Sequence, residues 1–483
     1  MGTFLIGASL ERSTRAATAS RPVNRGAADP RDISANNSPS LSRNPLDRAN
    51  LAVANRIDTP SFSCALNVSF DDGATWAPTA IPFPAGEEAP PRCFAPDVAF
   101  GADGTLYASF VTLKGLGNTP NAAWTVSSRD GGRSLSSPAK AVGPLTFQVR
   151  LVADPLQPNR LYLSWLQASA TATLGFPSVG NPINLARSDD GGASWSTPVR
   201  VSAPARQRVV APSAAVGPRG ELYVSYLHLG QDSLDYAGAH EGKGGEPYPG
   251  RWSLVLARST DQGVSWQETV VDQQLVPTER FIVFFPPSPS MAVDARGGNV
   301  YVGFADGRRG DADVWVWASK DGGASFAAPT LVSEGTTAGT SQYLPKLAVA
   351  PDGRLDVVYY DRRSDPNNVM NEVSLQSSSD GAKTFGPRLR VSDAAFDSRI
   401  GFGSERGLPD LGSRLGLVSS ERRALAVWAD TRAGTEASNK QDLASATVSF
   451  PESSPLGQPL RYGGLVVAGV GVLVLLSWPR WRN

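Results

Sequence analysis

A short polar phrase recurs along the chain at nearly constant spacing. It has the form S-x-D-x-G-x-[ST]-[WF] and is written most fully as SDDGGASW at residues 188–195. Successive copies are separated by 59, 60, 71, 60 and 59 residues, and their third-position aspartates are Asp71, Asp130, Asp190, Asp261, Asp321 and Asp380. A fixed period of this length predicts repeated supersecondary units rather than several unrelated domains.

Each repeat contains four predicted strands. PSAAVGPRGELYVSYL at 212–227 alternates apolar and polar residues on either side of a turn, and WSLVLARSTDQGVSWQETVV at 252–271 adds a third strand, the polar phrase and a fourth strand. Alternation with a period of two, bounded by Gly, Pro and Asp, is typical of half-buried strands. Four-stranded sheets of this kind bury both faces by packing radially, so the sequence predicts an all-β β-propeller of four-stranded blades.

The number of blades follows from the first hairpin of each unit. Seven such hairpins can be counted, with six blades as the alternative, and they begin near Ser40, Pro96, Arg150, Pro212, Pro289, Pro345 and Arg414. The seventh unit has neither the polar phrase nor a clear fourth strand. We therefore expect RDISANNS, at residues 31–38, to supply the missing strand and close the ring.

Composition excludes one class of function and leaves the cysteines open. The chain has 45 basic and 45 acidic residues without a long run of like charge, which argues against nucleic-acid binding. Two cysteines, Cys64 and Cys93, cannot build a structural zinc site alone, and they form either one disulfide or two buried thiols. Nothing in the sequence calls for a cofactor.

The two ends of the chain differ from the repeats. We assign residues 1–34 to a disordered or processed segment, 35–450 to the propeller and 451–461 to a linker. The uncharged run YGGLVVAGVGVLVLLSW at 462–478, with aromatic residues at its ends, predicts a transmembrane helix, and a buried core helix is the alternative. The basic tail at 479–483 favours a cytoplasmic C-terminus, and hence a membrane-anchored protein with an extracytoplasmic propeller at the cell surface.

The polar phrase resembles the Asp-box, or BNR repeat, of sialidases and related β-propellers. The resemblance covers residues from about 37 to 450. In such a phrase the aspartate bonds backbone N–H groups of its own turn, the glycine permits positive φ, and the aromatic ring packs into the blade. We interpret the six aspartates as structural. The relatives that the resemblance implies include both glycoside hydrolases and propellers that only bind, so the fold does not decide the function.

A meander places the polar phrases and the long connections at opposite faces of the ring. The long connections are residues 227–251, 276–289, 333–345 and 394–410. Loops of this length in a compact domain are usually functional or disordered, and these carry aromatic and charged residues. We expect them to form a funnel over the central channel.

Three units end their second strand with the sequence D-x-R. The arginines are Arg308, Arg363 and Arg432, and three guanidinium groups near the axis would clamp a carboxylate. Sialidases hold the carboxylate of sialic acid with three arginines, so the resemblance implies an acidic ligand. The alternative is that each arginine joins neighbouring blades by a salt bridge. Further ligand-binding candidates are Arg280, Arg406 and Tyr343.

The resemblance also implies a tyrosine nucleophile with an acidic partner. The catalytic candidates are Tyr360, Glu279, Glu405 and Asp361. The Arg-Ile-Pro phrase that opens the first blade of sialidases is replaced here by NNSPSL, which puts catalysis in doubt. Two hypotheses remain: a sialidase-like glycoside hydrolase acting on acidic extracellular glycans, and a non-catalytic propeller that binds a glycan or a protein. We expect a monomer in either case.

Two metal sites are weaker alternatives. His228 and His240 flank DSLDY in the longest loop, but two histidines in a Gly-rich loop are more often solvent-exposed. Asp306, Asp311 and Asp313 could supply oxygen ligands to Ca²⁺, but the arginines between them oppose a cation. We expect no metal.

Overall fold

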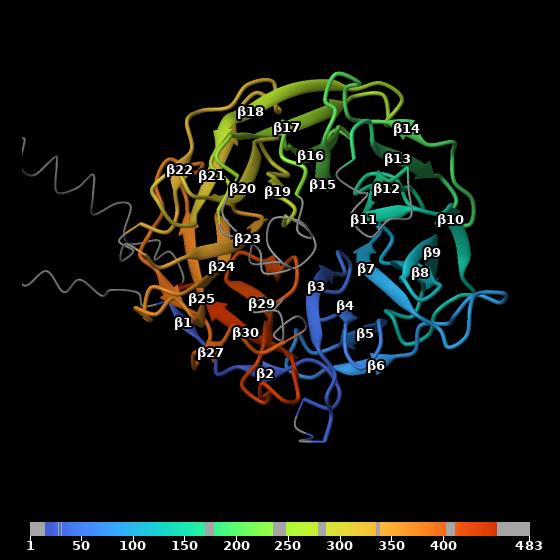
Figure 1. Cartoon of the computed structure of the whole chain (residues 1–483), viewed down its shortest axis with the longest axis horizontal. Helices are drawn as coiled ribbons and strands as arrows, with labels where there is room; N and C mark the ends of the chain where they lie inside the picture. The colour runs from blue at the N-terminus through green and yellow to red at the C-terminus, as the bar shows by residue number, and fades with distance from the viewer. Residues whose placement is uncertain are drawn as a thin grey trace, which may run out of the picture.

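Seven β-sheets form a closed ring around a central axis (Figure 1). The structure is a computed structural model that describes residues 15–27, 29, 31–169, 178–234, 248–278, 286–334, 339–401 and 411–451. Within these residues every regular element is a β-strand, and no helix occurs. The predicted seven-bladed propeller of four-stranded blades is confirmed, and the six-bladed alternative is wrong.

Each blade is an antiparallel meander, and its first strand lies nearest the axis (Figure 1). Blade 1 contains β3 (Asn36–Arg43), β4 (Leu51–Ile57), β5 (Ser63–Ser69) and β6 (Ala77–Thr79). Blade 2 contains β7 (Cys93–Phe100), β8 (Leu106–Lys114), β9 (Thr119–Ser128) and β10 (Ala139–Val142). Blade 3 contains β11 (Thr146–Ala153), β12 (Leu161–Gln167), β13 (Ile183–Ser188) and β14 (Val199–Arg200). Blade 4 contains β15 (Val209–Val216), β16 (Leu222–His228), β17 (Trp252–Ser259) and β18 (Gln267–Leu275).

The remaining three blades follow the same order along the chain. Blade 5 contains β19 (Ser290–Val293), β20 (Val300–Asp306), β21 (Asp313–Ser319) and β22 (Thr330–Leu331). Blade 6 contains β23 (Gln342–Val349), β24 (Leu355–Asp361), β25 (Met370–Ser378) and β26 (Leu389–Arg390), and β27 (Phe396–Asp397) also pairs with β25. Blade 7 contains β28 (Gly416–Ser419), β29 (Arg423–Asp430) and β30 (Asp442–Ser449).

The N-terminal segment closes the ring on the outer edge of blade 7. The short strands β1 (Ala16–Ala17) and β2 (Arg21–Pro22) both pair with β30. The expectation that residues 31–38 supply this strand is wrong, because residues from Asn36 onward already form β3, the innermost strand of blade 1. Part of the segment that the sequence placed outside the propeller therefore completes its last sheet.

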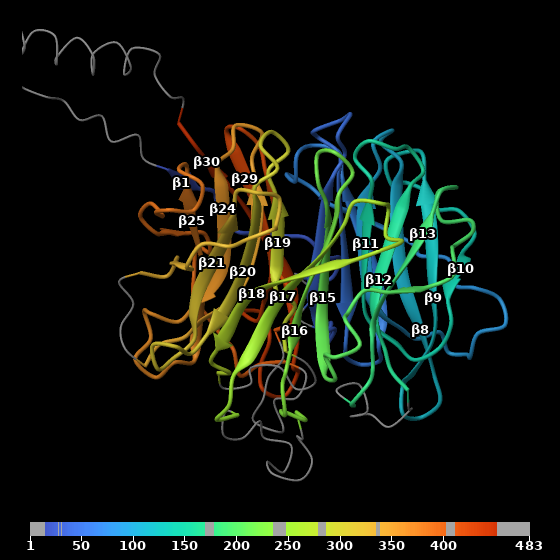
Figure 2. The ribbon, with the colours of Figure 1, turned by 90° about the horizontal axis from the view of Figure 1, so that it is seen from above.

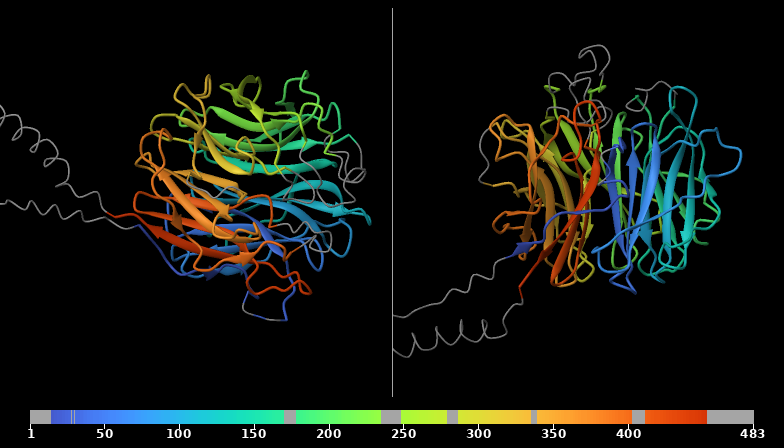
Figure 3. Two further views of the ribbon diagram at one scale, coloured as in Figure 1. Left: turned by 60° about the vertical axis from the view of Figure 1, so that its left-hand side comes forward. Right: turned by 90° about the horizontal axis from the view of Figure 1, so that it is seen from below.

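Apolar and aromatic side chains fill the spaces between neighbouring blades. The second strand of each blade is buried on both faces because a sheet packs against each side of it (Figure 3). Trp165, Trp317 and Trp428 are among the largest fully buried side chains. Burial of one large side chain contributes roughly 1.5–3 kcal/mol, so these interfaces between blades supply much of the driving force for folding.

The polar phrase forms the turn between the third and fourth strands in blades 1 to 6, and we name it the S-x-D turn. In blade 3, Ser188 Oγ donates to Asp190 Oδ1 (2.8 Å), and the backbone N–H of Gly192 donates to Ser188 Oγ (2.8 Å). The backbone N–H of Ser194 donates to Asp190 Oδ1 (2.9 Å), and Gly192 has φ +87°. The other five copies repeat these contacts, which supports a structural role for the aspartate.

Replacing Asp190 with Ala is expected to lower the free energy of unfolding by about 1–3 kcal/mol, because donors of the turn lose their acceptor. Asp190→Asn retains one acceptor oxygen and should lower the free energy of unfolding by a smaller amount. Chemical denaturation of both variants measures the effect. A folded Asp190→Ala protein with unchanged stability but impaired ligand binding would contradict the structural role of the turn.

The contribution of these turns should also depend on pH. Hydrogen bonds from Ser265 and Ser259 lower the pKa of Asp261 to about 2, below its ordinary value of 3.8. Because the folded-state pKa is depressed, the stabilisation is present above about pH 4 and is lost as the pH falls through about 2. The difference in stability between wild type and Asp261→Ala should therefore shrink over that range, whereas a constant difference would contradict the assignment.

The two ends of the ring carry different connections (Figure 2). In blade 1 the start of β4 pairs with the end of β5 (Leu51 with Ser69), so the S-x-D turn lies beside the hairpin that joins the first two strands. We name this end the turn face and the opposite end, which carries the longer connections, the loop face. The described chain ends, near Arg15 and Pro451, lie at the turn face because Ala16 pairs with Ser449 beside Arg423.

One disulfide joins the first two blades. Cys64 on β5 and Cys93 at the start of β7 are bonded, with their Cα atoms 5.8 Å apart. Of the two alternatives left open by the sequence, the structure therefore has the disulfide.

The predicted transmembrane helix at 462–478 lies outside the described residues. A search of the described part of the chain finds no helix with the length and apolar character needed to cross a membrane.

Candidate functional site

The first D-x-R arginine connects blades 4 and 5. Arg308 follows β20 and donates from Nη2 to Oδ2 of the fully buried Asp306 (2.6 Å). The same nitrogen donates to Asp272 Oδ2 on β18, the outer strand of blade 4 (2.8 Å). The guanidinium group also lies over the rings of Trp315 and Trp317, 5.0 and 5.4 Å from their centroids. Arg308 thus fills an interface between blades.

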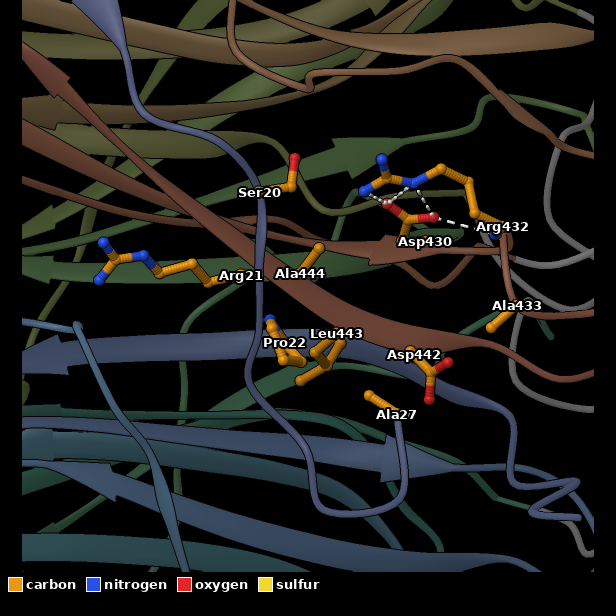
Figure 4. A pocket seen from close by; sticks show the side chains of 10 residues that line it. All are labelled: Ser20, Arg21, Pro22, Ala27, Asp430, Arg432, Ala433, Asp442, Leu443 and Ala444. Atoms are coloured by element: carbon orange, nitrogen blue, oxygen red, sulfur yellow. Dashed lines mark hydrogen bonds and ion pairs between the residues drawn. The ribbon is translucent and has the colours of Figure 1, made fainter. Parts of the chain in front are cut away.

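The other two D-x-R arginines also pair with their own aspartate and contact the preceding blade. Arg432 pairs with Asp430 of its own turn and with Asp393 (2.5 Å), which follows the last strand of blade 6. Figure 4 shows Arg432 over Asp430 in the wall of a pocket of about 250 Å³ beside β2, at the outer edge of blade 7. Arg363 pairs with Asp361 (2.7 Å) and donates to the Glu334 carbonyl after blade 5 (3.4 Å). Arg308 and Arg432 therefore form salt bridges between blades, and Arg363 contacts the preceding blade through a backbone carbonyl.

Two tyrosine candidates lie inside blade 6. Tyr360 is fully buried, and its hydroxyl donates to the Ala429 carbonyl (3.2 Å) and accepts from the Ala429 N–H (3.0 Å). The hydroxyl of Tyr343 bonds Asn371 Oδ1 (2.8 Å). The fourth catalytic candidate, Asp361, is also fully buried and paired with Arg363. The structure therefore uses these side chains in packing and hydrogen bonding.

Several candidates cannot be placed. Glu279, Arg280, Glu405 and Arg406 lie outside the described residues, as does His240.

The carboxylates considered for a metal have protein partners instead. Asp306 pairs with Arg308, and Asp313 accepts from Ser333 Oγ (2.8 Å). Asp311 Oδ2 accepts from the N–H of Gly339 (2.8 Å). Within the described ranges, no group of three or more His, Cys, Asp or Glu side chains is arranged to hold a metal ion.

A pocket of about 460 Å³ opens on the loop face between blades 4, 5 and 6, and we name it the loop-face pocket. Its lining comes from two kinds of connection: those between the second and third strands of a blade, and those between the last strand of one blade and the first strand of the next. The lining residues include Tyr248, Arg251, Thr278, Asp311, Ser341 and Asn368. The 227–251, 276–289 and 333–345 loops that the sequence singled out for function therefore meet at one place. This confirms that they share a face.

The polar groups of the loop-face pocket are held in place but not all satisfied. Asn368 Oδ1 accepts from the N–H of Ser341 (2.8 Å), and Asn368 Nδ2 donates to Ser341 Oγ (3.2 Å). The exposed guanidinium group of Arg251 bonds only nearby carbonyls, such as that of Gly250 (3.0 Å). No acidic partner for Arg251 occurs among the residues with described positions. Within the described residues, the pocket thus presents the Arg251 guanidinium group and the Asp311 carboxylate together with amide and hydroxyl groups.

Sequence reasoning missed Arg251 and Asn368. Arg251 lies at the end of the longest predicted loop and Asn368 in the turn after D-x-R of blade 6, but neither belongs to a repeated motif. Their position next to Ser341 depends on how blades 4, 5 and 6 pack, which the spacing of repeats does not specify.

Comparison with known proteins identifies the fold. No family model matches the chain, and no curated protein matches it. A crystal structure of a protein of unknown function from Dyadobacter fermentans DSM 18053 superposes with a TM-score of 0.51 at 16% identity, covering 90% of this chain and 99% of that one. The phage phi92 endosialidase superposes with a TM-score of 0.50 at 10% identity, covering 91% of this chain and 70% of the endosialidase chain. The Hadza microbial sialidase Hz136 superposes with a TM-score of 0.44 at 14% identity, covering 85% of this chain and 65% of the sialidase chain.

At these identities the likeness to the Dyadobacter protein and the phage endosialidase shows a shared fold alone. The structural neighbours include sialidases and α-L-arabinofuranosidases, all of which are β-propellers.

Proposed function

We propose that this protein is a sialidase-type Asp-box propeller that binds acidic glycans through its loop face. The S-x-D turns support the Asp-box assignment, because six copies share one hydrogen-bonding pattern around the aspartate. The shared fold with a phage endosialidase is consistent with it. Because a fold hosts many functions, the ligand is argued from the site.

The loop-face pocket carries the proposal. Its volume of about 460 Å³ falls in the range of small-molecule sites. Arg251 offers a planar fork of donors to a carboxylate, and Tyr248 offers an aromatic face to a sugar ring. Thr278 and Asn368 supply groups that can exchange hydrogen bonds with sugar hydroxyls. Together these are the elements needed to recognise a sugar acid.

Binding is favoured over hydrolysis as the activity of this site. Tyr360 and Asp361 are buried and hydrogen-bonded within blade 6, so neither is available to a substrate in this conformation. Glu279 and Glu405 remain candidates for an acid or base. Hydrolysis is therefore retained as the second candidate function and is tested in the same experiment.

We also propose that the propeller is anchored to the membrane by residues 462–478 and lies outside the cytoplasm. The chain leaves the propeller at the turn face, near Pro451, so an anchor there would point the loop face away from the bilayer. The disulfide between Cys64 and Cys93 fits an oxidising compartment.

Replacing Arg251 with Ala should weaken the binding of a sialylated trisaccharide by about tenfold or more, because a charge-assisted contact is lost. Arg251→Lys keeps the charge but loses the fork and should be intermediate. The matched control is Arg48→Ala, which removes an exposed arginine from the turn face. Isothermal titration with 3′-sialyllactose and with neutral lactose measures the effect on all proteins.

Equal affinity for the sialylated and neutral sugars, or an unchanged affinity in Arg251→Ala, would contradict the proposed site. Release of free sialic acid during the titration would favour the hydrolase, and Glu279→Gln and Glu405→Gln would then identify the acidic group.

A further inference from the structure

A ring of equivalent side chains lines the central channel, and we name it the axial ring. At or near the start of the innermost strand, five blades carry a tripeptide with a central proline, such as SPS, APD or LPK, and blades 3 and 7 carry QVR and GSR at the same place. The third residues of these tripeptides are Ser40, Asp97, Arg150, Ser213, Ser290, Lys346 and Arg414. These residues lie in or beside the first hairpins from which the seven blades were counted. Three members of the ring are cationic and one is acidic.

A β-bulge sets the direction of these side chains. In blades 1, 2, 3, 4 and 6 the pairing of the first two strands shifts register immediately before the ring position. The residue two places earlier has positive φ in each of these blades, and none of the five is glycine: Ser38, Ala95, Gln148, Ala211 and Leu344. Non-glycine residues in this region are uncommon, and bulges often re-aim side chains beside functional sites.

Two cationic members reach across the channel. Arg414, in blade 7, lies 3.6 Å from Asp97 in blade 2 and donates to the Pro96 carbonyl of that blade. Arg150, in blade 3, donates to Ser288 Oγ at the entry to blade 5 (2.9 Å). Neither contact joins adjacent blades. Asp97, Arg150 and Arg414 also act electrostatically on Lys346, so the four charged members of the axial ring lie close to one another.

The charges of the axial ring do not balance. The Asp97 carboxylate accepts hydrogen bonds from Ser40 Oγ and from the N–H of Leu151 (3.0 Å), and it pairs with Arg414. The hydrogen bonds of Arg150 go to neutral oxygens. The ammonium group of Lys346 makes no hydrogen bond or ion pair with any residue that the structure describes.

The pKa of Lys346 is lowered mainly by burial, and the neighbouring arginines contribute to the shift. Burial in the channel and the charges of Arg414 and Arg150 lower the pKa of Lys346 to about 8, and the charge of Asp97 opposes this shift. Burial and the charge of Arg414 also lower the pKa of Arg150. Among the residues that the structure describes, Lys346 and Arg150 form no ion pair, although the charge of Asp97 acts on both.

We infer that the axial ring binds a small oxoanion, inorganic sulfate or phosphate, between Lys346 and Arg150. An oxoanion presents several acceptor oxygens, which suit one ammonium group and one guanidinium fork, and it would relieve the repulsion between them. None of these residues lines the loop-face pocket, so this site is separate from the proposed glycan site. Its occupation would link blades 3 and 6 across the axis.

We expect Lys346→Met to change the melting temperature differently in the absence and in the presence of the anion. In anion-poor buffer, Lys346→Met should raise the melting temperature, because a repelling charge is removed. With millimolar sodium sulfate, the wild type should gain stability and Lys346→Met should gain only the general effect of a kosmotropic salt. Isothermal titration of sulfate should show affinity at least tenfold weaker for Lys346→Met.

Two controls separate specific binding from salt effects. Lys320→Met removes one exposed lysine from an S-x-D turn and should keep the wild-type response to sulfate. Sodium chloride at equal ionic strength should not reproduce the stabilisation. Sulfate affinity of the wild type should also weaken as the pH rises above about 8, because the group with that pKa, Lys346, loses its charge beside Arg150, Arg414 and Asp97.

The inference is overturned if wild type and Lys346→Met respond equally to sulfate, or if Lys346→Met melts lower than wild type in anion-poor buffer. The second result would assign Lys346 a purely structural role. Binding of 3′-sialyllactose by Lys346→Met should remain unchanged, so loss of the axial site and loss of the glycan site give different results.

Discussion

Replacing Arg308 with Ala is expected to lower the free energy of unfolding by about 3–5 kcal/mol, because it leaves buried carboxylates without their cation. Asp306 is fully buried, and burial raises its pKa against the opposing hydrogen bonds from Arg308. The side chain of Asp272 is only 11% exposed and loses the same partner. Packing against Trp315 and Trp317 is lost as well. The change therefore weakens the joint between blades 4 and 5.

A matched D-x-R pair serves as the control. Asp397 and Arg399 form the same local pair (2.7 Å), but the side chain of Arg399 is 60% exposed. Arg399→Ala should cost only about 0–1 kcal/mol, as expected for an exposed ion pair. Urea denaturation measures both variants. If Arg308→Ala were as stable as wild type but failed to bind 3′-sialyllactose, the arginine would belong to a carboxylate clamp and not to the joint between blades.

The second large effect is expected for the disulfide. Cys93→Ser should lower the free energy of unfolding by roughly 3–4 kcal/mol, because the bond closes a loop with a sequence separation of 29 residues in the unfolded chain. Reduction of the wild type with dithiothreitol should produce a similar loss. Cys93→Ser itself should not respond to the reductant, and Cys64→Ser/Cys93→Ser should match the single variant.

Guanidinium denaturation with and without reductant measures this effect. Titration of two free thiols in the denatured wild type, together with insensitivity to dithiothreitol, would contradict the disulfide.

The architecture could be predicted because it repeats. The period of about 60 residues and the count of first hairpins gave seven blades, and the position of the S-x-D turns gave the turn face. The closing strands were missed because β1 and β2 have only two residues each and carry no periodic pattern. Edge pairing of that length depends on the open side of β30, which forms only when blade 7 folds.

The roles of individual side chains could be predicted less well. The sequence could not decide whether D-x-R arginines face the axis or a neighbour, because their acidic partners, such as Asp272 and Asp393, lie on another blade. Tyr360 was chosen as a catalytic candidate from a strand end, but β24 is buried on both faces and the ring lies in the core. The axial ring was not singled out from the sequence, because its charges meet only after the propeller closes.

The most direct test of the proposed glycan site is a crystal structure of the propeller soaked with 3′-sialyllactose at a concentration that saturates binding in solution. We expect ordered sugar in the loop-face pocket, with the carboxylate within hydrogen-bonding distance of Arg251 and the ring beside Tyr248. Sugar ordered at the turn face, or a loop-face pocket left empty while sugar is bound elsewhere, would contradict it.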